Sequence, residues 1–161
     1  MATRQTPNLT ARIPALTPYE SGDIMAVTSE YTIPATLAVN DVIEMGILPA
    51  GCIPVDFTLF TQAADSNGSP TLALDAGILS GNPFDALSVR TCGADFVAAT
   101  TVARAGGIQR AVVATGFQAT ASVLDRSYGL KVGAGAATLV VGAKLRATLT
   151  FSACPYGIDA A

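Results

Sequence analysis

Apolar and polar residues alternate along several short segments of this 161-residue chain, and turn-forming residues separate the segments. The clearest case lies near the C-terminal end, where a run over 144–152 places its apolar residues at every second position: Leu145, Ala147, Leu149 and Phe151. Successive side chains of a β-strand point to opposite faces of a sheet, so this period predicts a strand with one buried face. The chain is therefore predicted to consist mainly of strands.

Other segments repeat the pattern and predict strands over residues 31–39, 43–47, 53–59, 72–78, 108–115 and 127–132. The turn formers from Asp65 to Pro70, with Asn67-Gly68 supplying a pair of positive φ angles, predict that 53–59 and 72–78 form a β-hairpin. The alanine-rich segment 94–105 ends at Gly106-Gly107 and predicts one short helix. Several short strands with at most one helix indicate an all-β protein, an antiparallel jelly-roll-like β-sandwich over residues 30–161.

Residues 1–29 differ from the rest of the chain. They contain Pro7, Pro14 and Pro18 and show no sustained period. Proline fixes its own φ and restricts the residue before it, so this segment is expected to be extended. A frayed tail is one interpretation. We favour an extended N-terminal arm that lies along a neighbouring molecule, because the segment carries more apolar residues than a disordered tail usually does.

The apolar content of the chain is high, with 50% hydrophobic and only 13% charged residues. No apolar run reaches the length of about 18–20 residues that a membrane helix needs, and the N-terminus lacks the pattern of a secretory signal. The surplus is therefore expected to serve subunit contacts in an oligomer. The three cysteines, Cys52, Cys92 and Cys154, are far apart and are interpreted as small buried residues of a protein made in a reducing cytoplasm. A Cys52–Cys154 bridge stays open.

Charge is unevenly distributed along the chain. Residues 41–95 are net acidic and residues 96–161 are net basic, within a total of −3. Either strands from the two halves interleave and mix the charges, or complementary patches help subunits to align. No basic stripe suited to nucleic acid is present.

The sequence offers little for catalysis. The chain has no histidine, which excludes Ser-His-Asp and Cys-His systems and most zinc sites. Asp56 and Asp75 are expected on outward faces of neighbouring strands, where solvated carboxylates are ordinary. The segment from Asp65 to Ser69 has the spacing of a turn and departs from that of a calcium loop. We expect no enzyme activity, no catalytic residues, no metal site and no cofactor.

Five segments, taken in order, resemble a known family: NDVIEMGILPAGCIPVDFTLF, SNGSPTLALDAGIL, FVAATTVARAGGIQR, DRSYGLKV and KLRATLTF. Together they cover most of residues 40–151 and are similar to the small head-decoration, or cement, proteins of tailed bacteriophages. Before the turn that starts at Asp65, a member of that family is expected to have a more acidic run. This chain instead has Gln62-Ala63-Ala64-Asp65 there, with a single acid. Residues 1–29 lie outside the resemblance.

The resemblance implies a jelly-roll subunit, commonly a trimer, on the outer capsid surface of the virion, made in the host cytoplasm and bound to the major capsid protein between capsomers. Contacts with the capsid or a neighbouring copy are then expected from the arm, through Arg4, Pro7, Leu9, Arg12, Ile13, Leu16 and Tyr19. Neither a membrane nor a nucleic acid is an expected partner. Two alternatives stay open: a component of the phage tail, baseplate or fibre, and a β-sandwich that binds carbohydrate or a receptor.

Overall fold

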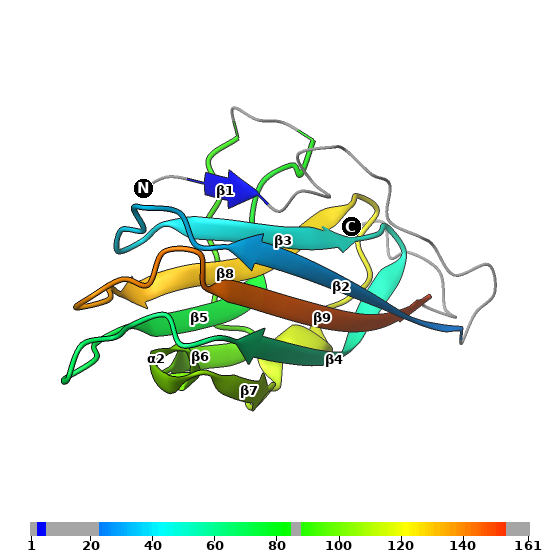
Figure 1. Cartoon of the computed structure of the whole chain (residues 1–161). Coiled ribbons are helices and arrows are strands. Elements are labelled where there is room, and N and C mark those ends of the chain that lie inside the picture. Colours follow the sequence, from blue (N-terminus) through cyan, green and yellow to red (C-terminus); the bar gives the residue numbers. More distant parts are fainter. Residues whose placement is uncertain (1–2, 6–22, 85–87, 154–161) are drawn as a thin grey trace.

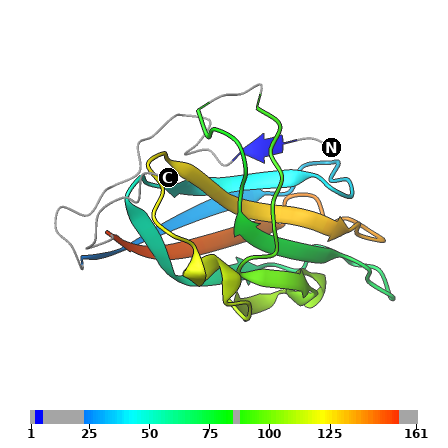
Figure 2. The ribbon, with the colours of Figure 1, turned by 180° about the vertical axis from the view of Figure 1, so that it is seen from behind.

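The computed structural model describes residues 3–5, 23–84 and 88–153, which form two β-sheets packed face to face. The front sheet, nearest the reader in Figure 1, has the strand order β2 (Ile24–Thr32), β9 (Lys144–Ala153), β4 (Cys52–Thr61) and β7 (Gly107–Arg110). The back sheet has the order β1 (Thr3–Gln5), β3 (Val42–Leu48), β8 (Arg126–Ala134), β5 (Ala73–Ile78) and β6 (Val97–Thr100). Figure 2 shows the back sheet from behind.

The path of the chain between the sheets is that of a jelly roll. Without β1, each sheet has four strands, and the orders β2-β9-β4-β7 and β3-β8-β5-β6 bring together strands that are distant in the sequence. All of the described strand pairs are antiparallel except β1 with β3, which run parallel over three residues. The predicted all-β, jelly-roll-like sandwich is confirmed.

The core lies between the sheets and follows the predicted alternation. In β9 the apolar residues Leu145, Ala147, Leu149 and Phe151 are all completely buried, while the residues between them face outward. Leu149 lies opposite Phe57 of β4, whose ring stacks on Phe96 with the ring centroids 4.9 Å apart. Each buried leucine or phenylalanine of this row contributes about 1.5–3 kcal/mol by leaving water, so the row stabilises the contact between the sheets.

The predicted hairpin between residues 53–59 and 72–78 is wrong, because β4 and β5 lie in different sheets. The turn formers between them belong to a connection that crosses from the front sheet to the back sheet. Neither Asn67 nor Gly68 has the positive φ expected of a tight hairpin turn. Alternation defines which side chains face the core, and two strands that face each other across a core alternate in the same way as two strands that pair.

The strand predicted over 31–39 is displaced. β2 ends at Thr32. Ile33 is bound to the loop before β9: its N–H donates to the Ala143 carbonyl oxygen at 2.9 Å, and its carbonyl oxygen accepts the N–H of Gly142 at 2.9 Å. Residues 33–41 then form the connection to β3, in which Asn40 has a φ of 68°. Pro34 lies in this connection, so its missing N–H group interrupts no strand ladder.

The helix predicted over 94–105 is present only at its end. β6 takes up Val97–Thr100, and a four-residue helix, α2 (Val102–Ala105), follows it. The helix stops at Gly106, whose φ of 84° suits a glycine, as the sequence predicts. The strand predicted over 108–115 is likewise short, because β7 ends at Arg110 and a 3-10 turn follows at Thr115–Gln118.

Part of the range predicted as the arm lies in the sheets. β1 occupies residues 3–5, and β2 begins at Ile24 rather than at residue 30. Residues 6–22 lie outside the described part of the chain. Of the cysteines, Cys52 and Cys92 are buried free thiols, as predicted, and Cys154 lies outside the described residues. Burial raises the pKa of the Cys92 thiol to about 12.

Candidate interaction surfaces

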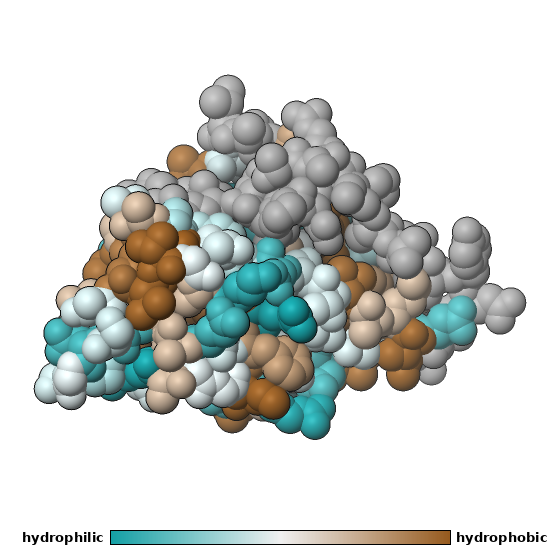
Figure 3. All heavy atoms as spheres, in the orientation of Figure 1, coloured by the Kyte–Doolittle hydropathy of each residue, from teal (hydrophilic) through white to brown (hydrophobic). Residues whose placement is uncertain are grey.

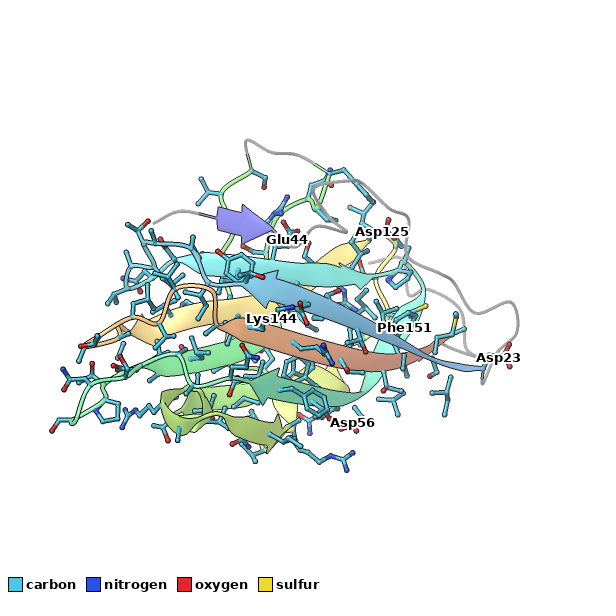
Figure 4. The ribbon with its side chains drawn as sticks, viewed as in Figure 1. Asp23, Glu44, Asp56, Asp125, Lys144 and Phe151 are labelled. Carbon is cyan, nitrogen blue, oxygen red and sulfur yellow. The ribbon has the colours of Figure 1, made fainter. Side chains whose placement is uncertain are left out.

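The two carboxylates considered for catalysis lie apart. Asp56 is on β4 of the front sheet (Figure 4) and forms an ion pair with Arg110. Asp75 is on β5 of the back sheet, where one oxygen lies 3.1 Å from the Lys131 ammonium and the other accepts the N–H of Ala99 at 2.8 Å. The sequence predicted that the two strands are neighbours, and this prediction is wrong because β4 and β5 lie in different sheets. Both carboxylates take part in structural ion pairs.

The described residues contain no cluster of three or more acidic or cysteine side chains that could hold a metal ion. Among those same residues, no helix is long and apolar enough to span a membrane.

On the outer face of the front sheet, the described side chains of β2 and β9 are exposed or half-buried. Threonines from neighbouring strands form its middle, and the hydroxyl oxygens of Thr28 and Thr148 lie 2.8 Å apart. Beside them the Glu30 carboxylate lies 2.6 Å from the Lys144 ammonium and 2.8 Å from the Arg146 guanidinium. Hydrogen bonds from Lys144 and Arg146 lower the pKa of Glu30. Figure 3 shows hydrophilic residues across the middle of this face and hydrophobic ones in separate patches around them.

The ion pairs settle how the uneven charge is arranged. Lys131 and Arg110, from the basic half of the chain, pair with Asp75 and Asp56 from the acidic half. Strands from the two halves interleave in both sheets, which brings these charges together. The interpretation in which the charges mix is therefore confirmed for these pairs.

Several large apolar side chains remain exposed on the described surface: Ile24, Val39, Val55, Phe60, Phe84, Val89, Ile108, Val112, Val123, Leu124 and Val141. Phe60 and Ile108 lie directly opposite each other on β4 and β7. Scattered exposed apolar residues are ordinary on a protein surface, so position and local structure decide which of them can serve a partner.

Part of the outer face of the back sheet is covered by residues 79–84 and 88–95. Leu79 and Cys92 of this segment form a small buried cluster with Val42 of β3. The segment lies close to the sheet because glycines line its path. A Cβ atom at Gly77 would come within 2.6 Å of the Gly93 carbonyl oxygen.

A buried ion pair fixes this segment to the sheet. Arg90 donates to one carboxylate oxygen of Glu44 on β3, and the Ser127 hydroxyl of β8 donates to the other. Arg90 also donates to the carbonyl oxygen of Asn82 at 2.6 Å, which ties residues 79–84 to residues 88–95. Glu44 is fully buried and Arg90 is 1% exposed. Figure 4 shows Glu44 above β3, beside β1 and away from Lys144.

Sequence reasoning missed this pair. Its signals were an acid inside the apolar strand VIEMGIL and a single arginine among the acids of residues 41–95. Charged side chains are almost never fully buried unless they are paired. The two residues are 46 positions apart, however, and only the fold brings them together.

Another buried carboxylate, that of Asp65, joins two loops. Asp65 accepts backbone N–H groups from both sides: at 2.8–3.3 Å from Asn67, Thr71 and Leu72, and at 2.9–3.0 Å from Ala137 and Thr138. Burial disfavours the charged carboxylate, but the hydrogen bonds from Thr138, Ala137, Thr71 and Leu72 outweigh it and hold the pKa of Asp65 well below its usual range. The predicted turn is therefore built around Asp65.

Of the residues predicted for the arm, the structure places one. Arg4 lies in β1, in register with Ile43 of β3. The remaining six lie outside the described residues: Pro7, Leu9, Arg12, Ile13, Leu16 and Tyr19.

No family model and no curated protein matches this chain. Solved structures do. A chain from the capsid of Ralstonia phage GP4 is 34% identical, with a TM-score of 0.89, and the match covers 95% of this chain and 99% of that chain. The two chains are therefore close in length.

Two more distant structures share the fold. A chain of the cyanophage Pam1 capsid asymmetric unit is 24% identical, with a TM-score of 0.66, over 89% of this chain and 96% of that one. A chain from the acidic stable capsid structure of Helicobacter pylori bacteriophage KHP30 is 11% identical, with a TM-score of 0.52, over 84% of this chain and 91% of that one.

Proposed function

We infer the function from one premise: this chain belongs to the family of the Ralstonia phage GP4 capsid chain that it matches, and it is a structural component of a bacteriophage capsid. We propose that it is a decoration protein. It binds the outer surface of the lattice that the major capsid protein forms, at junctions between capsomers, and it stabilises the shell there. The observation that carries this proposal is the match over nearly the full length of both chains.

The architecture supports this role physically. A stiff two-layer sandwich can bridge subunits without reorganising, so little binding energy is lost in ordering it. Each copy needs only modest affinity, because many copies act on one closed shell and each stabilises the state to which it binds.

We propose further that the N-terminal arm makes the main contact with the major capsid protein or with an adjacent copy. The support is its composition in the sequence and the position of β1. This strand lies at the edge of the back sheet, so the arm starts at the rim of the sandwich.

The test uses shells assembled from the major capsid protein without this chain. Added wild-type protein is expected to sediment with the shells and to raise the temperature at which they break open. A variant lacking residues 2–19 is expected to lose binding while its sandwich stays folded, since all eight jelly-roll strands remain. Full binding by the truncated protein would contradict the role of the arm, and an absence of binding by the wild type would contradict decoration.

A further inference from the structure

Asn67-Gly68, the pair that the sequence predicts for a hairpin turn, forms no hairpin and lies in the connection between β4 and β5. An asparagine before a glycine is chemically labile, because the backbone nitrogen of the glycine can attack the side-chain amide carbon. Glycine has no Cβ to hinder this approach. Of the four asparagines in the chain, only Asn67 precedes a glycine.

The nucleophile of this reaction, the backbone nitrogen of Gly68, is accessible. Asn67 and Gly68 are both exposed, and no atom lies within 4 Å of the position that a Cβ would take at Gly68. Within the described part of the chain, no group accepts the N–H of Gly68 in a hydrogen bond. Its proton can therefore pass directly to water or hydroxide.

The other two asparagines in the described ranges lack such a nucleophile. After Asn40, the N–H of Asp41 donates to the carbonyl oxygen of Ala38 at 3.1 Å. After Asn82 comes Pro83, whose nitrogen carries no hydrogen. The structure therefore separates Asn67 from both.

The side-chain amide of Asn67 is held on both sides by groups that favour its reaction. Its Oδ1 accepts the N–H of Ser69 at 2.9 Å, which draws electron density from the amide carbon and stabilises the negative charge that forms on this oxygen during attack. Its Nδ2, the leaving nitrogen, donates to the Thr138 hydroxyl at 3.1 Å. A hydroxyl within this reach can give its proton to the departing nitrogen and take one back from water.

Asp65 positions these groups. One of its carboxylate oxygens, Oδ1, accepts the N–H of Asn67 at 3.3 Å and the N–H of Thr138 at 2.9 Å. The N–H of Ser66 also donates to the carbonyl oxygen of Thr138 at 3.0 Å. The reacting residue and the hydroxyl beside it are thus held together before the reaction starts, which lowers the entropy that the reaction must lose.

We propose that Asn67 is a site of self-modification by deamidation. The nitrogen of Gly68 loses its proton to hydroxide and bonds to Cγ of Asn67, which closes a succinimide ring. The bond from Cγ to Nδ2 breaks, and this nitrogen takes a proton from the Thr138 hydroxyl and leaves as ammonia, while water returns the proton to Thr138.

Water then adds to one of the two ring carbonyls and opens the ring, which leaves aspartate or isoaspartate at position 67. The sum of the steps consumes one water and releases one ammonia, and nothing is oxidised or reduced. The exposed loop gains one negative charge, two residues from the buried Asp65. This inference concerns the chain itself and does not depend on the proposed function.

The test follows the folded protein over time in mildly alkaline buffer, since the Gly68 nitrogen must lose a proton. Peptide mapping by mass spectrometry should show Asn67 gaining the mass of an amide-to-acid exchange, in both aspartate and isoaspartate forms. Asn40 and Asn82 should stay intact in the same samples.

Two variants separate the parts of the mechanism. Gly68→Ala should slow the conversion about ten-fold, because its Cβ hinders the approach of the nitrogen. Thr138→Val should slow it several-fold, because the leaving nitrogen loses its proton donor. Both sites are exposed, and the backbone N–H of residue 138 still reaches Asp65. Thermal unfolding of both variants should therefore stay close to that of the wild type.

Three results would overturn the inference. If Asn67 stayed intact in the folded protein but converted in a urea-unfolded sample, the fold would protect this residue rather than expose it. Conversion of Asn40 or Asn82 at the same rate would show that the loop has no special reactivity. A wild-type rate in Thr138→Val would show that the arrangement around the leaving nitrogen does not act.

Discussion

At the scale of single residues, the sandwich depends on a few side chains that packing forces into one arrangement. The Glu44–Arg90 pair is the clearest, since neither charge is accessible to water. Removing one member of a buried pair leaves the other charge buried without its partner, which costs far more than the pair itself contributes. Gly77 is constrained in a different way, because a side chain at this position would collide with Gly93 and Asp95.

Arg90→Met is expected to lower the free energy of unfolding by about 3–5 kcal/mol, because Glu44 then remains buried without the arginine. Arg110→Met, at a pair whose arginine side chain is 71% exposed, should cost at most about 1 kcal/mol. Urea unfolding of the two variants makes the comparison. Equal losses would show that the burial of the Arg90 pair has no energetic consequence. The double variant E44L/R90M should recover much of the loss, since no charge is left buried.

Gly77→Ala should destabilise the protein by about 1–3 kcal/mol, the usual cost of overpacking. Its Cβ would lie 2.6 Å from the Gly93 carbonyl oxygen and 2.5 Å from an Asp95 carboxylate oxygen. Gly68→Ala is the matched control, because no atom lies within 4 Å of the Cβ that it would add. Thermal unfolding should separate the two variants, and a Gly77→Ala protein as stable as Gly68→Ala would refute the close approach of the segment to the sheet.

At the scale of elements, strands are readable from the sequence and their connections are not. The period of β9 and of β3 is strict enough to place both correctly. The sequence pattern does not show which strands pair with each other. β2, for example, pairs with β9 from the other end of the chain. The crossing between β4 and β5 is held by one carboxylate and backbone amides from two loops, and no local pattern shows that Asp65 will reach Ala137 and Thr138.

This carboxylate predicts a specific response to acid. The folded-state pKa of Asp65 lies below its unfolded value, so its contribution to stability is complete above about pH 4 and is lost as the pH falls further. Asp65→Asn is expected to be less stable than the wild type at pH 7, with the difference narrowing between pH 4 and pH 2. Urea unfolding at several pH values measures it. Asp23→Asn, at an exposed residue, is the control and should change little. A difference for Asp65→Asn that stays constant with pH would exclude the role of its charge.

At the scale of the whole molecule, the fold class was predictable and the contact surface was not. Repeated alternation with almost no helix indicates a sandwich, and the two orders of four strands confirm it. A docking surface has no such period. The buried Glu44–Arg90 pair, for example, becomes visible only once the fold brings the two residues together. Of the arm residues that the sequence singled out, only Arg4 lies within the described part of the chain, so the role of the arm remains a prediction.

Self-association belongs to this scale as well. We propose a trimer, and light scattering coupled to size-exclusion chromatography is expected to give a mass of three chains. A monomer at micromolar concentration would contradict this, and would require that the exposed apolar residues meet only the shell.

The most direct measurement is the number of copies of this chain in purified particles, by quantitative mass spectrometry against the major capsid protein. Decoration predicts about one copy for every one to three capsid subunits, since reinforcement by weak, repeated contacts needs copies throughout the lattice. A ratio below about one in twenty would place the chain at a minor site of the particle and contradict decoration, because so few copies could not act on the shell as a whole.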